Sequence, residues 1–397
     1  MNIMRKCPIC GSDEMEFIKK INLNLSVEMR QKIKYPKSHD IVCCDKCGMV
    51  FVNSPLSKED IDNYYISCNM YDNMGEVKSE DLLEVCEINF NALLPYLTDE
   101  PKIIDVGCGG GAFLKFLKDK GYNKLYGLDP SESSVSKLKE EGINGIVGSV
   151  YEELPKEWHG KFDVVVCTSV FEHLLFPDIA LKNLTELVKK DGIIYLVVPD
   201  AEGFSKYLRE VPNYFNHEHI NYFTTKTMDY LCSRNGLLRL SSDEECRHIL
   251  TPNSPEMAIF AIYKFTANSS DKVIDIPDKE GKKSVIEYFR LIEQQQKQNR
   301  RRIEELISQD KQIIIWGTGS LSSALLTEIP GLENKVECFI DNNSNKQGTT
   351  HWGKEIFGPD VLMSYPNAII MVCIMINRDS VIKQIREMKL KNELFLL

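Results

Sequence analysis

Short apolar runs alternate with amphipathic segments through the middle of the chain. Five runs have the apolar character of strands buried in a sheet, and they are Ile103–Val106, Lys124–Leu128, Gly145–Gly148, Phe162–Cys167 and Gly192–Pro199. Between the first two, residues 112–121 place Phe113, Phe116 and Leu117 on one side of a short helix. Strands that alternate with helices at this spacing predict an α/β fold built on a doubly wound parallel sheet.

A second alternation of this kind occupies the C-terminal third. Residues 266–281 are polar and lack periodicity, which predicts a linker, and residues 282–308 predict a long helix with one apolar side. Gln312–Trp316 and Val336–Ile340 then predict the first strands of a second Rossmann-like domain.

Size and charge limit the classes of protein and partner. The 397 residues suffice for two or three domains, and the net charge of −10 argues against a nucleic-acid backbone as the main partner. No apolar run approaches the roughly 20 residues that span a membrane, and the first residues lack the apolar core of a signal peptide. We therefore expect a cytoplasmic protein without a membrane partner, whose 13 cysteines are thiols or metal ligands.

The first predicted strand runs directly into a turn that contains Gly107, Gly109 and Gly111. Glycines let the backbone approach a ligand closely. Asp129, at the end of the next apolar run, can accept hydrogen bonds from both hydroxyls of a ribose. Asp105, two residues before the first glycine, suits the cationic amino-acid end of S-adenosylmethionine (SAM) and suits a pyrophosphate badly. The pattern therefore favours a SAM site.

The same turn also fits the loose dinucleotide pattern G-x-G-x-x-G/A through Gly107, Gly109 and Ala112, so NAD remains an alternative. Ligands of doubly wound sheets bind beyond the carboxyl ends of the strands. This rule places Ser149 and Thr168 around the same crevice.

Two C-x-x-C-G segments near the N-terminus predict a structural zinc site. Their cysteines are Cys7 and Cys10 in the first and Cys44 and Cys47 in the second. Each segment presents two thiolates on one turn, and two such turns complete a tetrahedral site that is closed to substrate. Cys44 is preferred to the adjacent Cys43 because Cys44 carries the spacing. A redox C-x-x-C pair is the alternative, but the thioredoxin-like βαβ setting that it needs is missing.

At this point a resemblance emerges. Asp105 to Gly111, Asp129 and the segment Phe171-Glu172-His173-Leu174 resemble a class I SAM-dependent methyltransferase. The cysteine pairs, residues 47–53 and the later His217-Glu218-His219 narrow the resemblance to three-domain, zinc-containing methyltransferases that act on nucleotide-linked deoxysugars. Many of these enzymes are C-methyltransferases, and the resemblance covers nearly the whole chain.

The resemblance implies that the three glycines flank SAM, that Asp129 holds its ribose, and that a segment with Tyr64, Tyr65 and Tyr71 closes over the cofactor. Relatives often place an acidic residue near the adenine where this chain has Ser149. The implied domains are a zinc-binding module, a SAM-binding domain, a linker with a long helix, and a C-terminal Rossmann-like domain that walls the substrate cleft. Their bounds are residues 1–80, 81–265, 266–310 and 311–397.

Residues 214–223 hold two of the seven histidines around one carboxylate. Methyl transfer from a sulfonium needs a nucleophile that has lost its proton, and a histidine suits the removal of that proton because its pKa lies near neutrality. If the segment is extended, His217 and His219 share one face and Glu218 faces the other way. The resemblance favours His219 as the base, with Glu218 and His217 positioning substrate or stabilising an enolate. His173 is expected to form a pocket wall.

Other roles for these histidines remain open. They can line an interdomain surface without chemistry, and a metal site formed by His217 and His219 lacks a third ligand of suitable spacing. In the C-methyltransferase relatives a tyrosine commonly precedes the H-E-H run, where this chain has Asn216.

The predicted function is methyl transfer from SAM to a nucleotide-activated keto-deoxy sugar, at carbon through an enolate. O-methylation of a sugar or glycan hydroxyl stays open, as do an NAD(P)-dependent sugar-modifying enzyme and a non-catalytic zinc scaffold. The second glycine turn, Gly317-Thr318-Gly319, has Ser322 in place of a third glycine, so a dinucleotide is not expected there. That domain either binds another nucleotide or is purely structural.

Overall fold

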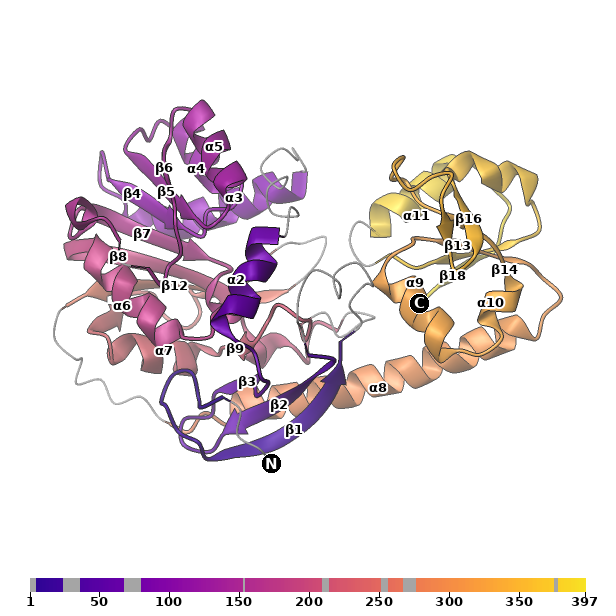
Figure 1. Ribbon diagram of the computed structural model, residues 1–397, viewed down its shortest axis with the longest axis horizontal. Coiled ribbons are helices and arrows are strands. Elements are labelled where there is room, and N and C mark those ends of the chain that lie inside the picture. Colours follow the sequence, from indigo (N-terminus) through magenta and orange to yellow (C-terminus); the bar gives the residue numbers. More distant parts are fainter. Residues whose placement is uncertain are drawn as a thin grey trace. The chain divides into compact units, whose positions relative to one another are not determined.

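The computed structural model describes residues 5–23, 36–67, 80–152, 154–208, 214–250, 256–266, 276–374 and 378–397. The described residues form two compact units (Figure 1). The larger unit contains those up to Tyr207 and those from Tyr214 to Glu287, and the smaller contains Leu208 and Tyr288–Leu397. Each unit is described separately.

A mixed sheet forms the centre of the larger unit. Its strands are ordered β10-β12-β8-β7-β4-β5-β6, with β11 paired to β12. Their bounds are β4 Ile103–Val106, β5 Leu125–Asp129, β6 Asn144–Val147, β7 Phe162–Thr168, β8 Val188–Pro199, β10 Leu237–Arg239, β11 Arg247–Ile249 and β12 Met257–Phe265. Strands β6, β5, β4, β7 and β8 run parallel, and β12 is antiparallel to β8. The predicted α/β fold is confirmed.

Helices connect these strands. They are α2 Lys58–Ser67, α3 Glu80–Leu93, α4 Ala112–Asp119, α5 Glu132–Glu140, α6 Pro177–Leu187 and α7 Thr225–Ser233, with short 3₁₀ turns η1 Leu94–Tyr96, η2 Lys156–Trp158, η3 Phe171–His173 and η4 Ala201–Gly203. The predicted first helix ends at Asp119, two residues before Gly121, which has a φ of 97° and a left-handed conformation. Glycine commonly ends helices in this way.

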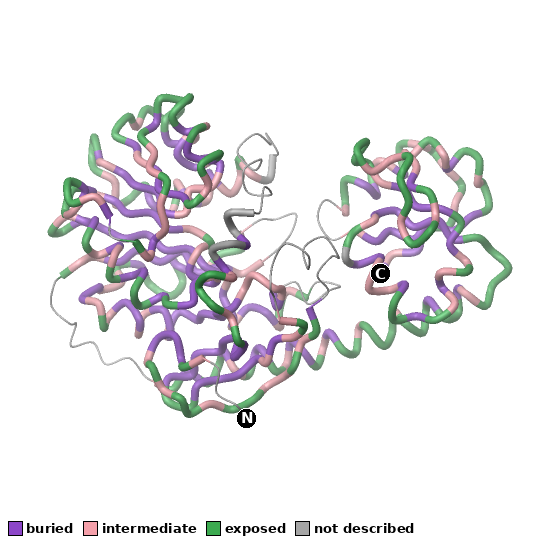
Figure 2. The backbone as a smooth tube through the Cα atoms, viewed as in Figure 1, coloured by how far each residue is buried: buried purple, intermediate pink, exposed green. Residues whose placement is uncertain are grey.

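The sheet is buried on both faces because alternate side chains enter different apolar layers. Val164 and Val166 of β7 pack in a layer with Leu117 of α4, whereas Val165 of the same strand packs in a layer with Leu184 of α6. Figure 2 shows these strands as buried and the outer sides of the helices as exposed. This two-sided burial explains the continuous apolar runs of the sequence.

An antiparallel sheet near the N-terminus belongs to the same unit. Its order is β1-β2-β3-β9, with bounds β1 Met15–Asn22, β2 Ser38–Cys44, β3 Val50–Val52 and β9 Asn221–Tyr222. Strand β9 follows the H-E-H run directly, and Phe51 pairs with Asn221. The cysteine pairs and the histidine segment are therefore connected through one sheet. The domain division drawn from the sequence stays a prediction.

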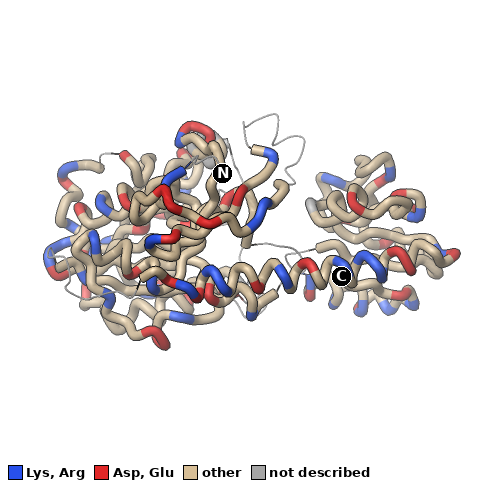
Figure 3. The backbone as a smooth tube through the Cα atoms, turned by 90° about the horizontal axis from the view of Figure 1, so that it is seen from below, with Lys and Arg blue, Asp and Glu red and all other residues tan. Residues whose placement is uncertain are grey.

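The smaller unit is a second Rossmann-like sheet, with order β15-β16-β14-β13-β17-β18. Its strands are β13 Ile313–Trp316, β14 Val336–Ile340, β15 Thr350–His351, β16 Lys354–Phe357, β17 Ile369–Val372 and β18 Leu394–Leu396, and its helical elements are α9 Ser320–Glu328, α10 Leu332–Lys335, η5 Pro359–Ser364 and α11 Arg378–Glu387. The predicted long helix is α8, Glu280–Ile307. Basic and acidic residues alternate along it, as expected for a solvated surface (Figure 3).

None of the helices in the described part of the chain is long and apolar enough to cross a membrane.

Candidate functional site

The glycine turn between β4 and α4 depends on backbone angles that favour glycine. Gly107, Gly109 and Gly111 have φ values of 79°, 49° and 74°. A Cβ atom at Gly107 would lie 2.5 Å from Val170 Cγ2, and one at Gly111 would lie 2.2 Å from Leu138 Cδ2. A Cβ at Gly109 would meet no atom within 4 Å. Packing therefore requires the outer two glycines, whereas Gly109 faces open space.

Asp129 lies at the carboxyl end of β5, beside this turn. Its Oδ2 accepts a hydrogen bond from the Gly109 amide at 2.8 Å, and its Oδ1 accepts one from the Ser131 amide at 2.9 Å. These bonds fix the direction of the carboxylate. Since each carboxylate oxygen can accept more than one hydrogen bond, the same group can also bind ribose hydroxyls.

Asp105 is a buried carboxyl group on β4, with 3% of its surface exposed. Its Oδ1 has no hydrogen-bond partner among the described residues. Burial, and to a smaller extent the nearby Asp129, raises the pKa of Asp105 to about 7. A buried polar atom without a partner is unfavourable, and an ammonium group would satisfy it. The orphaned oxygen and the open glycine turn therefore fit SAM.

Two of the other residues predicted to contact the cofactor, Ser149 and Thr168, lie at or just after the ends of β6 and β7. Thr168 is the half-buried last residue of β7, and Tyr71 lies outside the described residues. The Ser149 amide donates to Glu152 Oε2 at 3.3 Å, so a carboxylate does stand beside Ser149. Glu152 was not predicted from the sequence, although the S-x-x-E spacing is typical of a side chain that folds back in this way.

The histidine segment is bent, contrary to the extended geometry considered from the sequence. Asn216 Oδ1 accepts hydrogen bonds from the amides of Glu218 and His219, both at 2.8 Å. This turn brings Glu218 Oε1 to 4.0 Å from His217 Nε2 instead of directing the two side chains to opposite faces. Asn216 thus shapes the backbone of the H-E-H run.

A tyrosine from α2 completes this cluster. The buried Tyr64 hydroxyl donates a short hydrogen bond to Glu218 Oε1 and lies 3.0 Å from His217 Nε2. A phenol therefore stands beside Glu218 even though residue 216 is an asparagine. Nothing in the spacing of the sequence indicated this pairing, because 154 residues separate the partners.

His173 and His219 form a second pair. Their rings lie 4.9 Å apart at an angle of 75°, and His173 Nδ1 lies 3.1 Å from the Glu218 carbonyl oxygen. Burial, with the neighbouring His173 and His217, lowers the pKa of His219 well below its usual value. His219 is therefore a neutral imidazole near pH 7, which is the form that accepts a proton.

Glu172 is a buried acid that the sequence analysis did not assign. Its exposed fraction is 2%, its Oε2 has no partner among the described residues, and burial raises its pKa to about 8. One ligand atom each from Glu172, His173 and His219 lie within 4.8 Å of one another. The structure therefore places His219 close to Glu172 and His173. It does not place His217 and His219 together as two ligands of one metal ion.

The four predicted cysteine ligands come together in the larger unit. Their sulfur atoms lie within 4.8 Å of one another, with 3.5 Å between those of Cys7 and Cys47 and between those of Cys10 and Cys44. These distances are far longer than a disulfide and close to the edge of a tetrahedral site with zinc–sulfur bonds of about 2.3 Å. Cys43 is outside this set, and its thiol donates to the Gly48 carbonyl at 3.5 Å.

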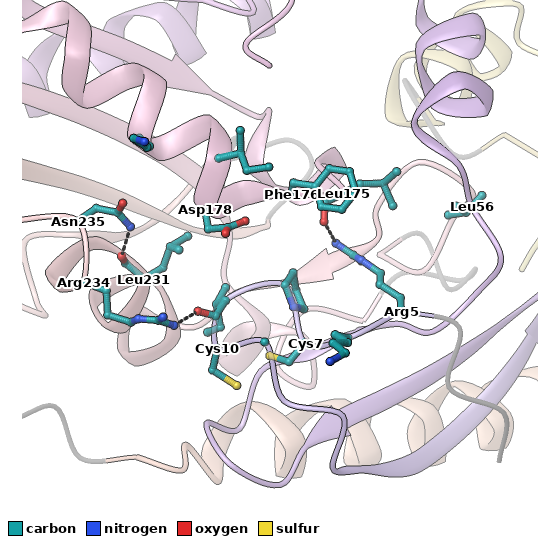
Figure 4. A pocket seen from close by; sticks show the side chains of 16 residues that line it. Arg5, Cys7, Cys10, Leu56, Leu175, Phe176, Asp178, Leu231, Arg234 and Asn235 are labelled. Carbon is teal, nitrogen blue, oxygen red and sulfur yellow. Dashed lines mark hydrogen bonds between the residues drawn. The ribbon is translucent and has the colours of Figure 1, made fainter. Parts of the chain in front are cut away.

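A cavity of about 640 Å³ lies beside the first cysteine turn (Figure 4). Arg5 and Arg234 line it together with Cys7, Cys10 and Asp178. Its lining includes neither the glycine turn at residues 107–111 nor the histidines of the H-E-H run.

The glycine turn of the smaller unit carries its own acid. Thr318 Oγ1 donates to Asp341 Oδ2, and Lys346 Nζ lies 3.0 Å from the same oxygen. Ser322 is fully buried, and its hydroxyl donates to the Gly319 carbonyl at 2.9 Å. A serine therefore fills the place of the third glycine, as the sequence indicates.

Comparison with known proteins decides the class of the larger unit. Residues 80–241 match a family model described as a methyltransferase domain. Residues 80–241 are therefore a methyltransferase domain. This methyltransferase domain contains the glycine turn, Asp129 and the whole H-E-H segment. Residues 309–394 match a second family model, described as C2185-like, N-terminal.

The similarity to individual proteins is partial. The ubiquinone biosynthesis O-methyltransferase of Pseudomonas aeruginosa is 30% identical over 100 residues, which are 24% of this chain and 43% of that protein. The Escherichia coli protein of the same name is 25% identical over 159 residues, 39% of this chain and 66% of that one. The chain thus spans less than half the length of the first relative.

Magnesium protoporphyrin IX methyltransferase from Synechocystis PCC 6803, crystallised with bound SAH, has a TM-score of 0.42 and 14% sequence identity. The alignment covers 53% of this chain and 100% of that one.

Proposed function

We propose that this chain transfers a methyl group from SAM to carbon in a nucleotide-activated keto-deoxy sugar. The observation that carries the SAM assignment is the buried Asp105 carboxyl with an unpartnered oxygen beside an open glycine turn. The sugar assignment rests on the resemblance of the cysteine pairs and the H-E-H run to the nucleotide-sugar methyltransferases.

The residues proposed to hold SAM fall into three groups. Asp105 binds the ammonium end, Gly107, Gly109 and Gly111 let the backbone approach, and Asp129 accepts the ribose hydroxyls. Ser149, Thr168 and Tyr71 remain proposed neighbours of the cofactor, and Glu152 joins them because it contacts the Ser149 amide. When bound, SAM would supply a methyl group attached to a positively charged sulfur. The sulfur compound that leaves is neutral, so the leaving group needs no acid from the protein.

The histidine cluster is proposed to prepare the nucleophile. His219, which is held neutral by burial, removes the proton beside the sugar ketone. Glu218 is held by the Tyr64 phenol, and His217 adjoins the same phenol. Of these groups, the His217 imidazole can donate a hydrogen bond to the enolate oxygen that forms, whereas the Glu218 carboxylate can accept one from a substrate hydroxyl and so position the sugar.

The cysteine cluster is proposed to hold one structural zinc ion through Cys7, Cys10, Cys44 and Cys47. Four thiolates leave no position for substrate, so the metal stabilises the surrounding fold. The C-terminal Rossmann-like unit is proposed to be a substrate domain.

O-methylation of a hydroxyl is the second candidate. Two observations favour it, namely Asn216 at the position of a tyrosine and the similarity to O-methyltransferases. Transfer of an isotope-labelled methyl group to a panel of nucleotide sugars, followed by NMR of the product, separates the two. A label bonded to carbon supports the first proposal, and a label bonded to oxygen supports the second.

Cofactor binding is tested separately from the substrate. SAM should raise the melting temperature of the protein and NAD should not, because the stabilisation follows the affinity for the folded state. Stabilisation by NAD alone would contradict the SAM assignment.

A further inference from the structure

Arg5 joins two segments that are distant in the sequence. Its Nη2 donates to the carbonyl oxygens of Leu174 and Leu175 at 3.0 and 2.8 Å. Its Nη1 donates to the Ile220 carbonyl at 3.3 Å, and Nη2 also donates to Asn221 Oδ1 at 2.9 Å. One guanidinium group thus holds the segment after η3 and the segment that enters β9.

Both segments carry a histidine next to the atoms that Arg5 binds. His173 immediately precedes Leu174, and His219 immediately precedes Ile220. The buried Asn221 strengthens the connection, because its Nδ2 donates to the Leu174 carbonyl at 2.7 Å. The relative position of the two imidazoles therefore depends on backbone groups that share the guanidinium.

Arg5 is itself held by the segment around β3 and lies just before the first cysteine turn in the sequence. Its amide donates to Asn53 Oδ1 at 3.0 Å, its guanidinium carbon lies 5.7 Å from the centre of the Phe51 ring, and Cys7 follows two residues later. Figure 4 shows Arg5 directed toward Leu175 beside the cysteines. The cysteine cluster and the histidine pair are therefore linked through a single side chain.

We propose that Arg5 is a positioning residue that holds His173 and His219 in their relative orientation and couples this orientation to the cysteine cluster. The catalytic part of this inference rests on the proposed function of His219. The structural part, the orientation of the rings, does not. Arg5 acts only through backbone carbonyls and the Asn221 amide, and it has no contact with a reacting atom.

The chain supplies a matched control for this proposal. Arg234 is a second arginine beside the cysteine cluster. It is the residue that ends α7, and its Nη1 donates to the Ile9 carbonyl of the first cysteine turn. Arg234→Ala therefore removes an arginine contact to the same turn and leaves the histidine segments untouched.

The experiment compares Arg5→Ala, Arg5→Lys and Arg234→Ala in the zinc-loaded full-length protein labelled with ¹⁵N-histidine. We expect Arg5→Ala to shift the ring signals of His173 and His219, and to retain its metal content and affinity for S-adenosylhomocysteine. Once a sugar substrate is identified, the kcat of Arg5→Ala should be about tenfold or more below that of the wild type at nearly unchanged KM. The reason is that small displacements of reacting groups lower the rate by large factors. Added guanidinium ion should partly restore kcat.

Arg234→Ala should leave the ring signals and kcat as they are in the wild type. The inference is overturned if Arg5→Ala leaves both rings unchanged, or if Arg234→Ala shifts them equally. If Arg5→Ala fails to fold, Arg5→Lys decides by the same ring signals, because a lysine keeps the charge but cannot bridge four acceptors. If the sugar panel yields no product, the proposed function fails, and the ring signals still test the positioning role.

Discussion

The most informative single perturbation is Asp105→Asn. A protein carboxylate that accepts a hydrogen bond from an ammonium group contributes about 1.5–3 kcal/mol, which is roughly a 10- to 100-fold change in affinity. We therefore expect the Kd for SAM to rise by about that factor at pH 7.5. Isothermal titration calorimetry measures it directly. Wild-type affinity in the variant would refute the assignment of Asp105 to the ammonium end.

The pKa of Asp105 predicts how the wild-type affinity depends on pH. Burial raises this pKa to about 7, so the free protein holds the proton below pH 7 and must release it when the cation binds. Affinity should fall about tenfold for each pH unit below 7, with one proton released per SAM, and should fall again above about 7.7 as the amino group of SAM loses its proton. Calorimetric titrations in buffers of different ionisation enthalpy measure the number of protons released on binding.

The variants separate Asp105 from its neighbour. Asp105→Asn should abolish the dependence of affinity on pH between about 5.5 and 7, because an amide does not titrate in this range. Asp129→Asn should weaken SAM binding but keep the dependence, with a lower midpoint, because Asp129 is the smaller cause of the raised pKa. A flat wild-type profile over this range would refute the reasoning.

The same carboxyl links cofactor binding to stability. A folded-state pKa raised from 3.8 to about 7 means that the folded protein binds the proton more tightly than the unfolded chain. Stability contributed by the protonated form is therefore present below pH 4 and is lost as pH rises to about 7, by on the order of 4 kcal/mol. Without SAM, Asp105→Asn should be more stable than the wild type at pH 8 in urea denaturation.

Three further predictions concern the histidine base, the metal and the glycine turn. His219→Ala should lower turnover by about 100-fold or more while the Kd for SAM stays within about twofold, and normal turnover would reject His219 as the base. Elemental analysis should find one zinc per chain, lost in Cys47→Ser and kept in Cys43→Ser, and a folded protein free of metal would contradict the zinc proposal. Gly107→Ala should destabilise the protein by about 1–3 kcal/mol more than Gly109→Ala, because only the former adds a clash to the strained φ; equal denaturation midpoints would contradict this packing argument.

Features that depend on local spacing could be predicted from the sequence. The strand predicted at 162–167 was found at Phe162–Thr168, and the strand predicted at 145–148 was found at Asn144–Val147. Glycine turns and C-x-x-C pairs are equally local, since each is specified by a few adjacent residues. The strand predicted at 192–199 begins earlier, at Val188, which pairs with Phe162. The polar residues 189–191 hid this start from the apolar pattern, and the register shifts there, where Asp191 adopts a left-handed φ of 67°.

Contacts between distant segments could not be predicted in this way. Tyr64 and Glu218 are 154 residues apart, and Arg5 and Ile220 are 215 apart. Neither pair has a spacing that a periodic pattern could reveal. The orientation of Glu218 was also beyond the pattern, because the extended geometry assumes a strand, whereas the Asn216 side chain folds the segment into a bend.

The two acids that flank the crevice, Asp105 and Glu172, have a common physical character. Each is buried, each has one oxygen without a partner among the described residues, and burial raises the pKa of both, to about 7 and about 8. Asp105 lies on β4, and Glu172 lies in η3, which follows β7; β4 and β7 pair in parallel. Packing alone would favour an apolar residue at either position, since an unsatisfied buried carboxyl weakens the fold. The presence of two such carboxyl groups in one domain therefore favours ligand chemistry over structural support. A positively charged ligand offsets the free-energy cost of burying the Asp105 carboxylate. Positive charge is also the property that distinguishes a sulfonium cofactor with an ammonium group from a diphosphate.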